Sequence, residues 1–173
     1  MKLAFQTGGL HISPTIIDQM VEIGTKGVGV SIDGVGDIHD NQRGVKGSYE
    51  KALRTLDYLS DSTIPTLACT TQLNRLSFPY LLELLNRVSQ TRVKSWQIAQ
   101  TLPMGIGTKA TDLHFHPSDF FVIHELAAIF SVEAWKRGIL GIAANPLGYF
   151  APYERLIRSG PVSYTHLTLP TKA

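Results

Sequence analysis

The chain has 173 residues, a length that suits one ordinary domain with a sizeable hydrophobic core. Hydrophobic residues make up 43% of it and charged residues 17%, and the net charge of +2 is too small to indicate binding to nucleic acid or to an anionic membrane. No apolar run reaches the length of a bilayer span, and the first residues do not have the pattern of a signal peptide. We therefore expect a cytoplasmic protein in which the single cysteine, Cys69, is a packed thiol.

The first half of the chain alternates short apolar runs with helix signals. A strand over 3–6 runs into Thr7, and Ser13-Pro14 then predicts the start of a helix, because Ser is a favoured N-cap and Pro fits the first helical turn. The next predicted elements are a strand over 27–32, a polar loop over 38–44, a helix from Gly47-Ser48 and a strand over 64–71. The apolar centre of this last strand is typical of a strand covered on both faces.

The second half continues the alternation. It predicts a helix over 79–88, a strand over 95–100, a long helix from about Pro117 to Arg137, a strand over 139–144 and a weak helix from Tyr153. Repeated β-α units favour a parallel sheet with right-handed crossovers, so the predicted fold class is α/β.

Polar side chains follow the predicted strands at the point where each strand ends. Because the carboxyl ends of parallel strands meet at one edge of a sheet, where ligands bind, we expect these groups to share a site. They are able to hydrogen-bond a charged, hydroxyl-rich ligand, and they comprise Thr7-Gly8-Gly9, Ser31-Ile32-Asp33-Gly34, Thr70-Thr71-Gln72 with Asn74, and Gln97 to Gln100.

One of these strand ends carries a family resemblance. Val30-Ser31-Ile32-Asp33-Gly34, followed by His39-Asp40 and Arg43, resembles the fourth strand of radical S-adenosylmethionine (SAM) enzymes. Thr7-Gly8-Gly9 is similar to the T-N-G sequence that often ends their third strand. The resemblance implies an incomplete (β/α)6 TIM-like barrel of parallel strands over residues 1–144, corresponding to about strands 3 to 6 of the radical SAM core.

The second half resembles a narrower group, the radical SAM maturases with a C-terminal SPASM domain. The similar segments are Trp96 to Gln100, Pro103-Met104-Gly105, Asn145 to Glu154, and Leu156-Ile157-Arg158. In that group the segment similar to Asn145–Arg158 precedes a cysteine-rich SPASM region, so residues 145–161 would be a connection towards that domain. Residues 162–173 match one reading frame of a sequencing-library adaptor, and we expect this tail to be non-native.

The resemblance implies a parent enzyme that uses SAM and [4Fe-4S] clusters to modify a peptide or a peptide-derived cofactor precursor by hydrogen-atom abstraction. The family's C-x-x-x-C-x-x-C loop, its G-G-E-P segment and the SPASM cysteines do not occur in this sequence. One cysteine cannot hold an iron–sulfur cluster. We therefore expect this chain to be an inactive fragment that holds no metal by itself, and we assign no catalytic residue.

Five residues are the candidate cofactor-binding set: Thr7, Ser31, Asp33, Arg43 and Gln97. By resemblance, Thr7 and Ser31 would hydrogen-bond SAM, Arg43 would pair with its carboxylate, and the strand around Gln97 would lie along the adenine. Three of them have a structural alternative: Thr7 as a turn residue before two glycines, Asp33 as the residue that orders its own turn, and Arg43 as a solvated loop arginine.

Two other classes of protein stay open. One is an iron-free β/α domain that binds a nucleotide or phosphorylated ligand, which a glycine-rich loop directly at a helix N-terminus would distinguish. Gly105-Ile106-Gly107 lacks the third glycine and the acidic partner of a dinucleotide fingerprint. The other is a complete, non-catalytic α/β binding module, which a closed sheet without an exposed edge would favour.

Overall fold

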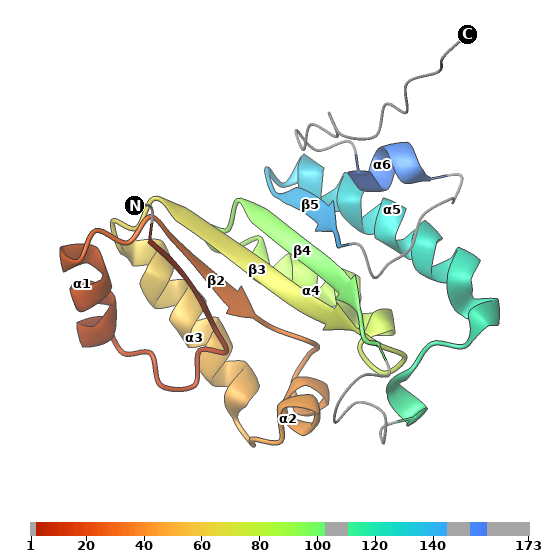
Figure 1. Ribbon diagram of the computed structural model, residues 1–173, viewed down its shortest axis with the longest axis horizontal. Helices are drawn as coiled ribbons and strands as arrows, with labels where there is room; N and C mark the ends of the chain where they lie inside the picture. The colour runs from red at the N-terminus through yellow and green to blue at the C-terminus, as the bar shows by residue number, and fades with distance from the viewer. Residues whose placement is uncertain (1–2, 103–110, 145–152, 159–173) are drawn as a thin grey trace, which may run out of the picture.

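The computed structural model of the chain describes residues 3–102, 111–144 and 153–158. In these residues a single parallel sheet runs in the strand order β1-β2-β3-β4-β5 (Figure 1). Its strands are β1 (Ala4–Thr7), β2 (Gly27–Ser31), β3 (Thr66–Leu73), β4 (Ser95–Gln100) and β5 (Leu140–Ala143). The α/β fold class and the parallel sheet predicted from the sequence are thereby confirmed.

Helices connect the successive strands. They are α1 (Pro14–Glu22), α2 (Asp37–Arg43), α3 (Ser48–Asp61), α4 (Leu81–Val88), α5 (Phe120–Lys136) and α6 (Glu154–Arg158). Short 3-10 turns occur at Phe78–Tyr80, Thr111–Leu113 and Pro117–Asp119. The predicted start of α1 is confirmed, because the Ser13 hydroxyl accepts a hydrogen bond from the Ile16 N–H at 3.3 Å. The α2 segment corrects the expectation of a loop over 38–44.

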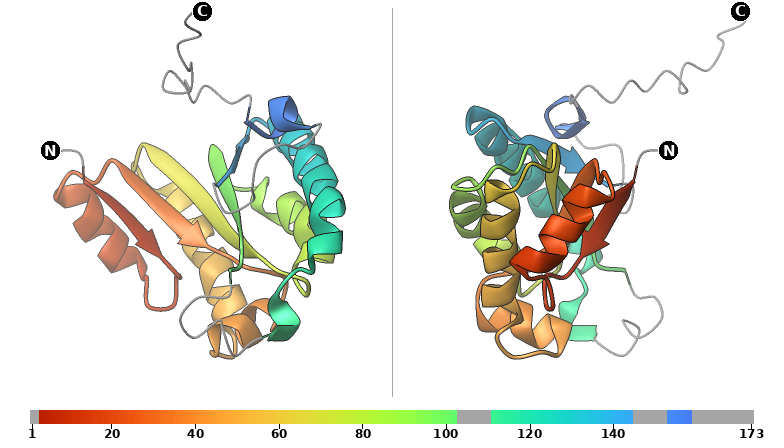
Figure 2. Two further views of the ribbon diagram at one scale, coloured as in Figure 1. Left: turned by 45° about the vertical axis from the view of Figure 1, so that its right-hand side comes forward. Right: turned by 90° about the vertical axis from the view of Figure 1, so that its left-hand side faces the viewer.

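The helices α3, α4 and α5 stack on one face of the sheet and leave the other face open in the described part of the chain (Figure 2). Side chains along β3 accordingly alternate between buried and more exposed positions. The expectation that this strand is covered on both faces is therefore wrong for the described structure. A sheet whose strands follow sequence order receives every right-handed crossover on the same face.

The core lies between the sheet and these helices. Val30, Cys69 and Trp96 are adjacent in the strand register and are fully buried on the helix-covered face. Trp96 packs edge-on against Phe130 of α5 and donates its indole N–H to Thr71 at 2.9 Å. Burial raises the pKa of Cys69 far above its ordinary range, so the prediction of a packed thiol is confirmed.

Strand order distinguishes this sheet from a doubly wound one, in which the order reverses at a switch point. Sequential order is that of a β/α barrel, and the sheet matches a partial TIM-like core. Among the described residues, β1 and β5 each pair on one side only, so closure of a barrel is not observed. In the same ranges no helix is long and apolar enough to cross a membrane.

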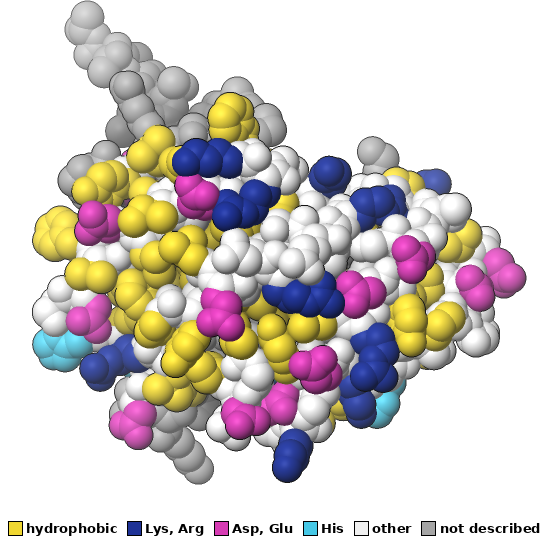
Figure 3. Space-filling model, turned by 180° about the vertical axis from the view of Figure 1, so that it is seen from behind, with side chains coloured by type: hydrophobic (Ala, Val, Ile, Leu, Met, Phe, Trp, Pro, Cys, Tyr) yellow, Lys and Arg dark blue, Asp and Glu magenta, His cyan; other side chains and the backbone are white. Residues whose placement is uncertain are grey.

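Figure 3 views the molecule from behind and shows its helix-covered face, where apolar side chains are interspersed with charged ones. The largest exposed apolar side chains of the described structure include four on α5: Phe121, Val122, Ile129 and Trp135. The predicted tail at 162–173, the segment 103–105 and most of the predicted connection at 145–161 lie outside the described residues.

Candidate functional site

A row of polar side chains crosses the open face of the sheet. The register pairs Ser31 of β2 with Thr70 of β3, and Thr70 with Gln97 of β4. Residues paired in this way project from the same face, and Gln97 is exposed there. The structure thus brings two of the predicted site residues, Ser31 and Gln97, onto one face with Thr70 between them.

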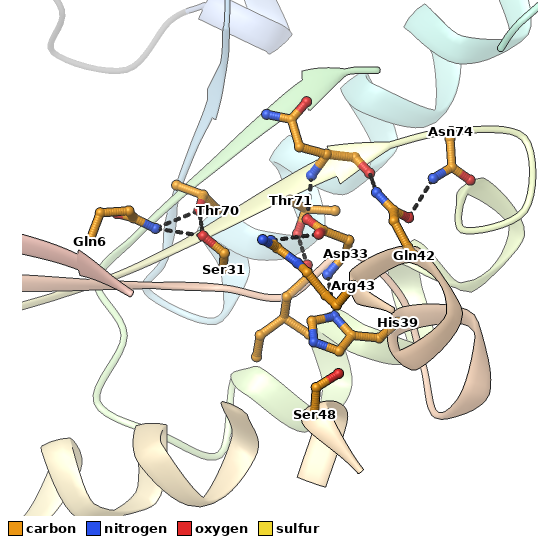
Figure 4. Close-up of polar contacts among 12 residues, drawn as sticks. Gln6, Ser31, Asp33, His39, Gln42, Arg43, Ser48, Thr70, Thr71 and Asn74 are labelled. Atoms are coloured by element: carbon orange, nitrogen blue, oxygen red, sulfur yellow. Dashed lines mark hydrogen bonds and ion pairs between the residues drawn. The ribbon is translucent and has the colours of Figure 1, made fainter. Parts of the chain in front are cut away.

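Gln6 of β1 completes this row, although sequence reasoning did not select it. Its side-chain amide donates to the Ser31 hydroxyl at 2.9 Å and to the Thr70 hydroxyl at 2.7 Å. The two hydroxyl oxygens are 3.0 Å apart and share a further hydrogen bond (Figure 4). Alternation within β1 was the available signal, since a side chain two residues from Ala4 shares its face.

A buried ion pair lies at the carboxyl ends of β2 and β3. Asp33 is 2% exposed, and its carboxylate pairs with the Arg43 guanidinium at 2.5 Å and accepts the Gln72 N–H at 2.8 Å. Burial raises the pKa of Asp33, while the Gln72 hydrogen bond and the Arg43 charge act in the opposite direction. Asp33 therefore ties the end of β2 to β3 and to α2 through contacts outside its own turn, and Arg43 is more than a solvated loop residue.

The helix α2 is fastened to these strand ends by several of its own side chains. The ring Nδ1 of His39 accepts the Asp33 N–H at 2.9 Å (Figure 4). Gln42 accepts a hydrogen bond from Asn74 at 2.5 Å and donates to the Gln72 carbonyl at 3.4 Å. The motif similar to the radical SAM sequence is therefore also a clamp that holds α2 against β2 and β3.

The residues next to this clamp have distinct electrostatics. Burial lowers the pKa of His39 to about 4; the Arg43 charge adds to this, and Asp40 opposes it. His39 is thus neutral at physiological pH. Asp40 accepts hydrogen bonds from Gly47 and Tyr49 at the start of α3, and these contacts lower the pKa of its carboxyl group.

Thr7 has a different environment from the other predicted site residues. It pairs in register with Val30, which is fully buried under the helices, so its side chain projects from the opposite face to Ser31. Its hydroxyl accepts the Gly9 N–H at 3.0 Å. The structure therefore gives Thr7 the role of a turn residue and does not bring it together with Ser31.

A pocket of about 260 Å³ lies beside the clamp, between α2 and the segment after β3. Its lining is mostly apolar and includes two side-chain amides: Ile38, Asn41, Gln42, Leu76, Tyr80 and Leu113. Within the described ranges, no group of three or more His, Cys, Asp or Glu side chains is arranged to hold a metal ion. Because the chain has a single, buried cysteine, its residues do not fit a [4Fe-4S] cluster.

Asp33→Ala is expected to lower the free energy of unfolding by about 2 kcal/mol, because it leaves the Gln72 N–H without its acceptor. Arg43 is one-third exposed and can turn to solvent, which limits the loss. Asp33→Asn retains an acceptor oxygen and is expected to lose about half as much. Urea unfolding of both variants measures this difference, and equal losses would contradict the assigned role of the Gln72 contact.

The sequentially ordered parallel sheet, with polar groups along its open face, matches part of a TIM-like β/α core. The chain is 26% identical over 112 residues to the sporulation killing factor maturation protein SkfB of Bacillus subtilis, a match that covers 63% of this chain and 27% of SkfB. It is 47% identical over 51 residues to a pre-heme d1 synthase of Dinoroseobacter shibae, covering 30% of this chain and 13% of that synthase. It is 22% identical over 121 residues to an AdoMet-dependent heme synthase of Methanosarcina barkeri, covering 69% and 34%.

No family model matches the chain. The matched region spans about a third or less of the length of each of these curated relatives. The relatives are radical SAM enzymes of the maturase and heme synthase types, so the predicted resemblance is confirmed, and the likeness supports membership of this chain in the radical SAM family.

Proposed function

We propose that this chain is part of the catalytic core of a cytoplasmic radical SAM/SPASM enzyme, with residues 1–144 forming part of the barrel and 145–161 leading towards the SPASM domain. The observation that carries the proposal is the polar row of Ser31, Thr70 and Gln97 on the open face of a sequentially ordered parallel sheet. In a β/α barrel this face lines the interior, and substrates bind at the carboxyl-terminal ends of its strands, where Ser31 lies.

In this proposal the chain's own residues bind and orient SAM. The Ser31 hydroxyl hydrogen-bonds the nucleoside, and Gln97 lies along the adenine. Arg43 has five donor N–H groups and one-third of its side chain exposed, so it is able to bind the SAM carboxylate while it holds Asp33. Thr7 has no contact with SAM in this proposal and remains a turn residue. The [4Fe-4S] cluster, held by thiolates that this chain lacks, would supply the electron for reductive cleavage of SAM.

We further propose a peptide or a peptide-derived cofactor precursor as the substrate of the parent enzyme. A maturation protein among the relatives supports this choice. A second candidate is a tetrapyrrole, because pre-heme d1 synthase is 47% identical over the 51 residues that it matches. Hydrogen-atom abstraction from either substrate would use the same SAM site.

The test begins with the DNA on either side of this reading frame, which is expected to encode a C-x-x-x-C-x-x-C sequence upstream. The longer protein, reconstituted with iron and sulfide under anaerobic conditions, should form 5′-deoxyadenosine from SAM and a reductant. Ser31→Ala is expected to lower kcat/KM for SAM about tenfold, the size of one hydrogen bond. Ser89→Ala, a change at a half-buried serine directly after α4, is the matched control. Absence of clustered cysteines upstream would overturn the proposal.

A further inference from the structure

The side chain of Gln6 crosses a whole strand to reach its partners. It starts on the edge strand β1, passes over Gly29 of β2 and ends at Thr70 of β3. A Cβ at Gly29 would lie 2.9 Å from the Gln6 Cδ and would overlap its amide oxygen. Because Gly29 is the register partner of Gln6, the absence of a side chain there leaves the space in which the Gln6 amide lies.

The hydrogen bonds around this amide leave one donor and one acceptor without a partner among the described residues. The Gln6 amide nitrogen has two protons, and it donates to both the Ser31 and the Thr70 hydroxyl oxygens. Those two hydroxyls also bond to each other, and only one of them can be the donor in that contact. Within the described ranges, one hydroxyl proton is therefore still free to donate, and the Gln6 amide oxygen has no protein partner there.

We propose that Gln6 is a positioning residue, which fixes the polarity of the Ser31–Thr70 hydroxyl pair so that one O–H and the Gln6 amide oxygen together face a ligand. This inference rests on the proposed function, since it concerns the same open face. A donor beside an acceptor suits a ligand hydroxyl, which both accepts and donates a hydrogen bond. Gln6 acts by orienting the Ser31–Thr70 pair, which in turn holds the Gln6 amide oxygen in place, and Gly29 is needed for Gln6 to reach the two hydroxyls.

The experiment compares two nucleosides with the full chain by NMR titration. Adenosine has ribose hydroxyls, and 2′,3′-dideoxyadenosine does not. The wild-type protein is expected to bind adenosine about tenfold more tightly, the size of one or two hydrogen bonds. Gln6→Met keeps the length of the side chain but removes its hydrogen bonds, and it should reduce this preference to within about twofold. Gln19→Met makes the same chemical change on the exposed side of α1 and should leave the preference intact.

A double-mutant cycle tests whether Gln6 and Thr70 influence the preference for adenosine through the same hydrogen bonds. Thr70→Val should also remove most of the preference, and Gln6→Met combined with Thr70→Val should be no worse than either change alone, because both act on one hydrogen-bond unit. The Gln6 side-chain amide protons should exchange slowly in the wild type, and this signal should be lost in Gly29→Ala. Backbone spectra establish that each variant remains folded.

Three results would overturn the inference: an unchanged preference in Gln6→Met, additive losses in the double variant, or no preference in the wild type. Failure of the proposed function gives a different pattern. In that case the chain still discriminates the two nucleosides through Gln6, but the longer reconstituted protein forms no 5′-deoxyadenosine. If Ser31→Ala lowers SAM turnover while Gln6→Met leaves the preference unchanged, the proposed function stands and the role of Gln6 is wrong.

Discussion

Gly9→Ala is expected to destabilise the protein by about 3–4 kcal/mol, because the new methyl group has neither an accessible conformation nor room. Gly9 follows β1 with a φ of +76°, a region that residues with a side chain rarely adopt. A Cβ there would lie 2.8 Å from the Cα of Ala52, and that atom belongs to the backbone of α3. The helix must therefore shift away from the sheet. Urea unfolding followed by far-ultraviolet circular dichroism measures the loss.

Gly8→Ala is the matched control for this prediction. A Cβ at Gly8 would meet no atom within 4 Å, and its φ lies outside the left-handed region. Its effect should stay below about 1 kcal/mol, the ordinary difference between glycine and alanine. A similar loss in both variants would mean that the turn as a whole, and not the contact with α3, limits the substitution.

The sequence predicted those elements whose stability comes from a long, repeated pattern. The strand over 95–100 was predicted with the bounds that the structure has, and the start of α3 at Ser48 was also predicted. The helix α2 was missed because it has seven residues and no apolar period. Contacts that are distant in sequence hold it in place, such as the hydrogen bond between Asn74 and Gln42. Tertiary contacts of this kind leave no local signal.

Part of the candidate site was predictable from the sequence, because it follows from the positions of the strand ends. The rule that ligands meet the ends of parallel strands selected Ser31 and Gln97, and the register brings them to one face. The same rule selected Thr7, but it says nothing about which face a residue occupies. Counting alternate residues within β1 would have separated Thr7 from Gln6. That Gln6 reaches Thr70 could not be inferred, because it requires the register that aligns Gly29 with Gln6.

One motif therefore serves two purposes in this fold. Asp33 and His39 hold α2 against the strand ends, and Ser31, two residues before Asp33, faces the open side of the sheet. Substitutions in the motif are therefore expected to alter stability and, under the proposed function, ligand binding as well. Ser31→Ala should affect binding more than folding, whereas Asp33→Ala should affect folding first, because Asp33 is 2% exposed and Ser31 is only half-buried.

Between pH 6.5 and pH 4, protonation linked to His39 is expected to lower the free energy of unfolding by about 2–3 kcal/mol. Burial lowers the pKa of His39 to about 4 in the folded state, against 6.5 as its ordinary value. Above pH 6.5 the residue is neutral in both states. As the pH falls below 6.5, the unfolded chain binds a proton that the folded protein does not, so the free energy of unfolding falls by up to about 1.4 kcal/mol per pH unit.

His39→Asn isolates this contribution, because an amide oxygen can still accept the Asp33 N–H but does not titrate. Urea unfolding at several pH values between 4 and 7 should give a flatter pH dependence for the variant. Asp33 acts in the opposite direction, since its raised pKa lets the folded protein bind a proton at a higher pH than the unfolded chain. That contribution is present in both proteins and cancels in the difference between them. Parallel pH curves would show that His39 is protonated in the folded protein as readily as in the unfolded chain.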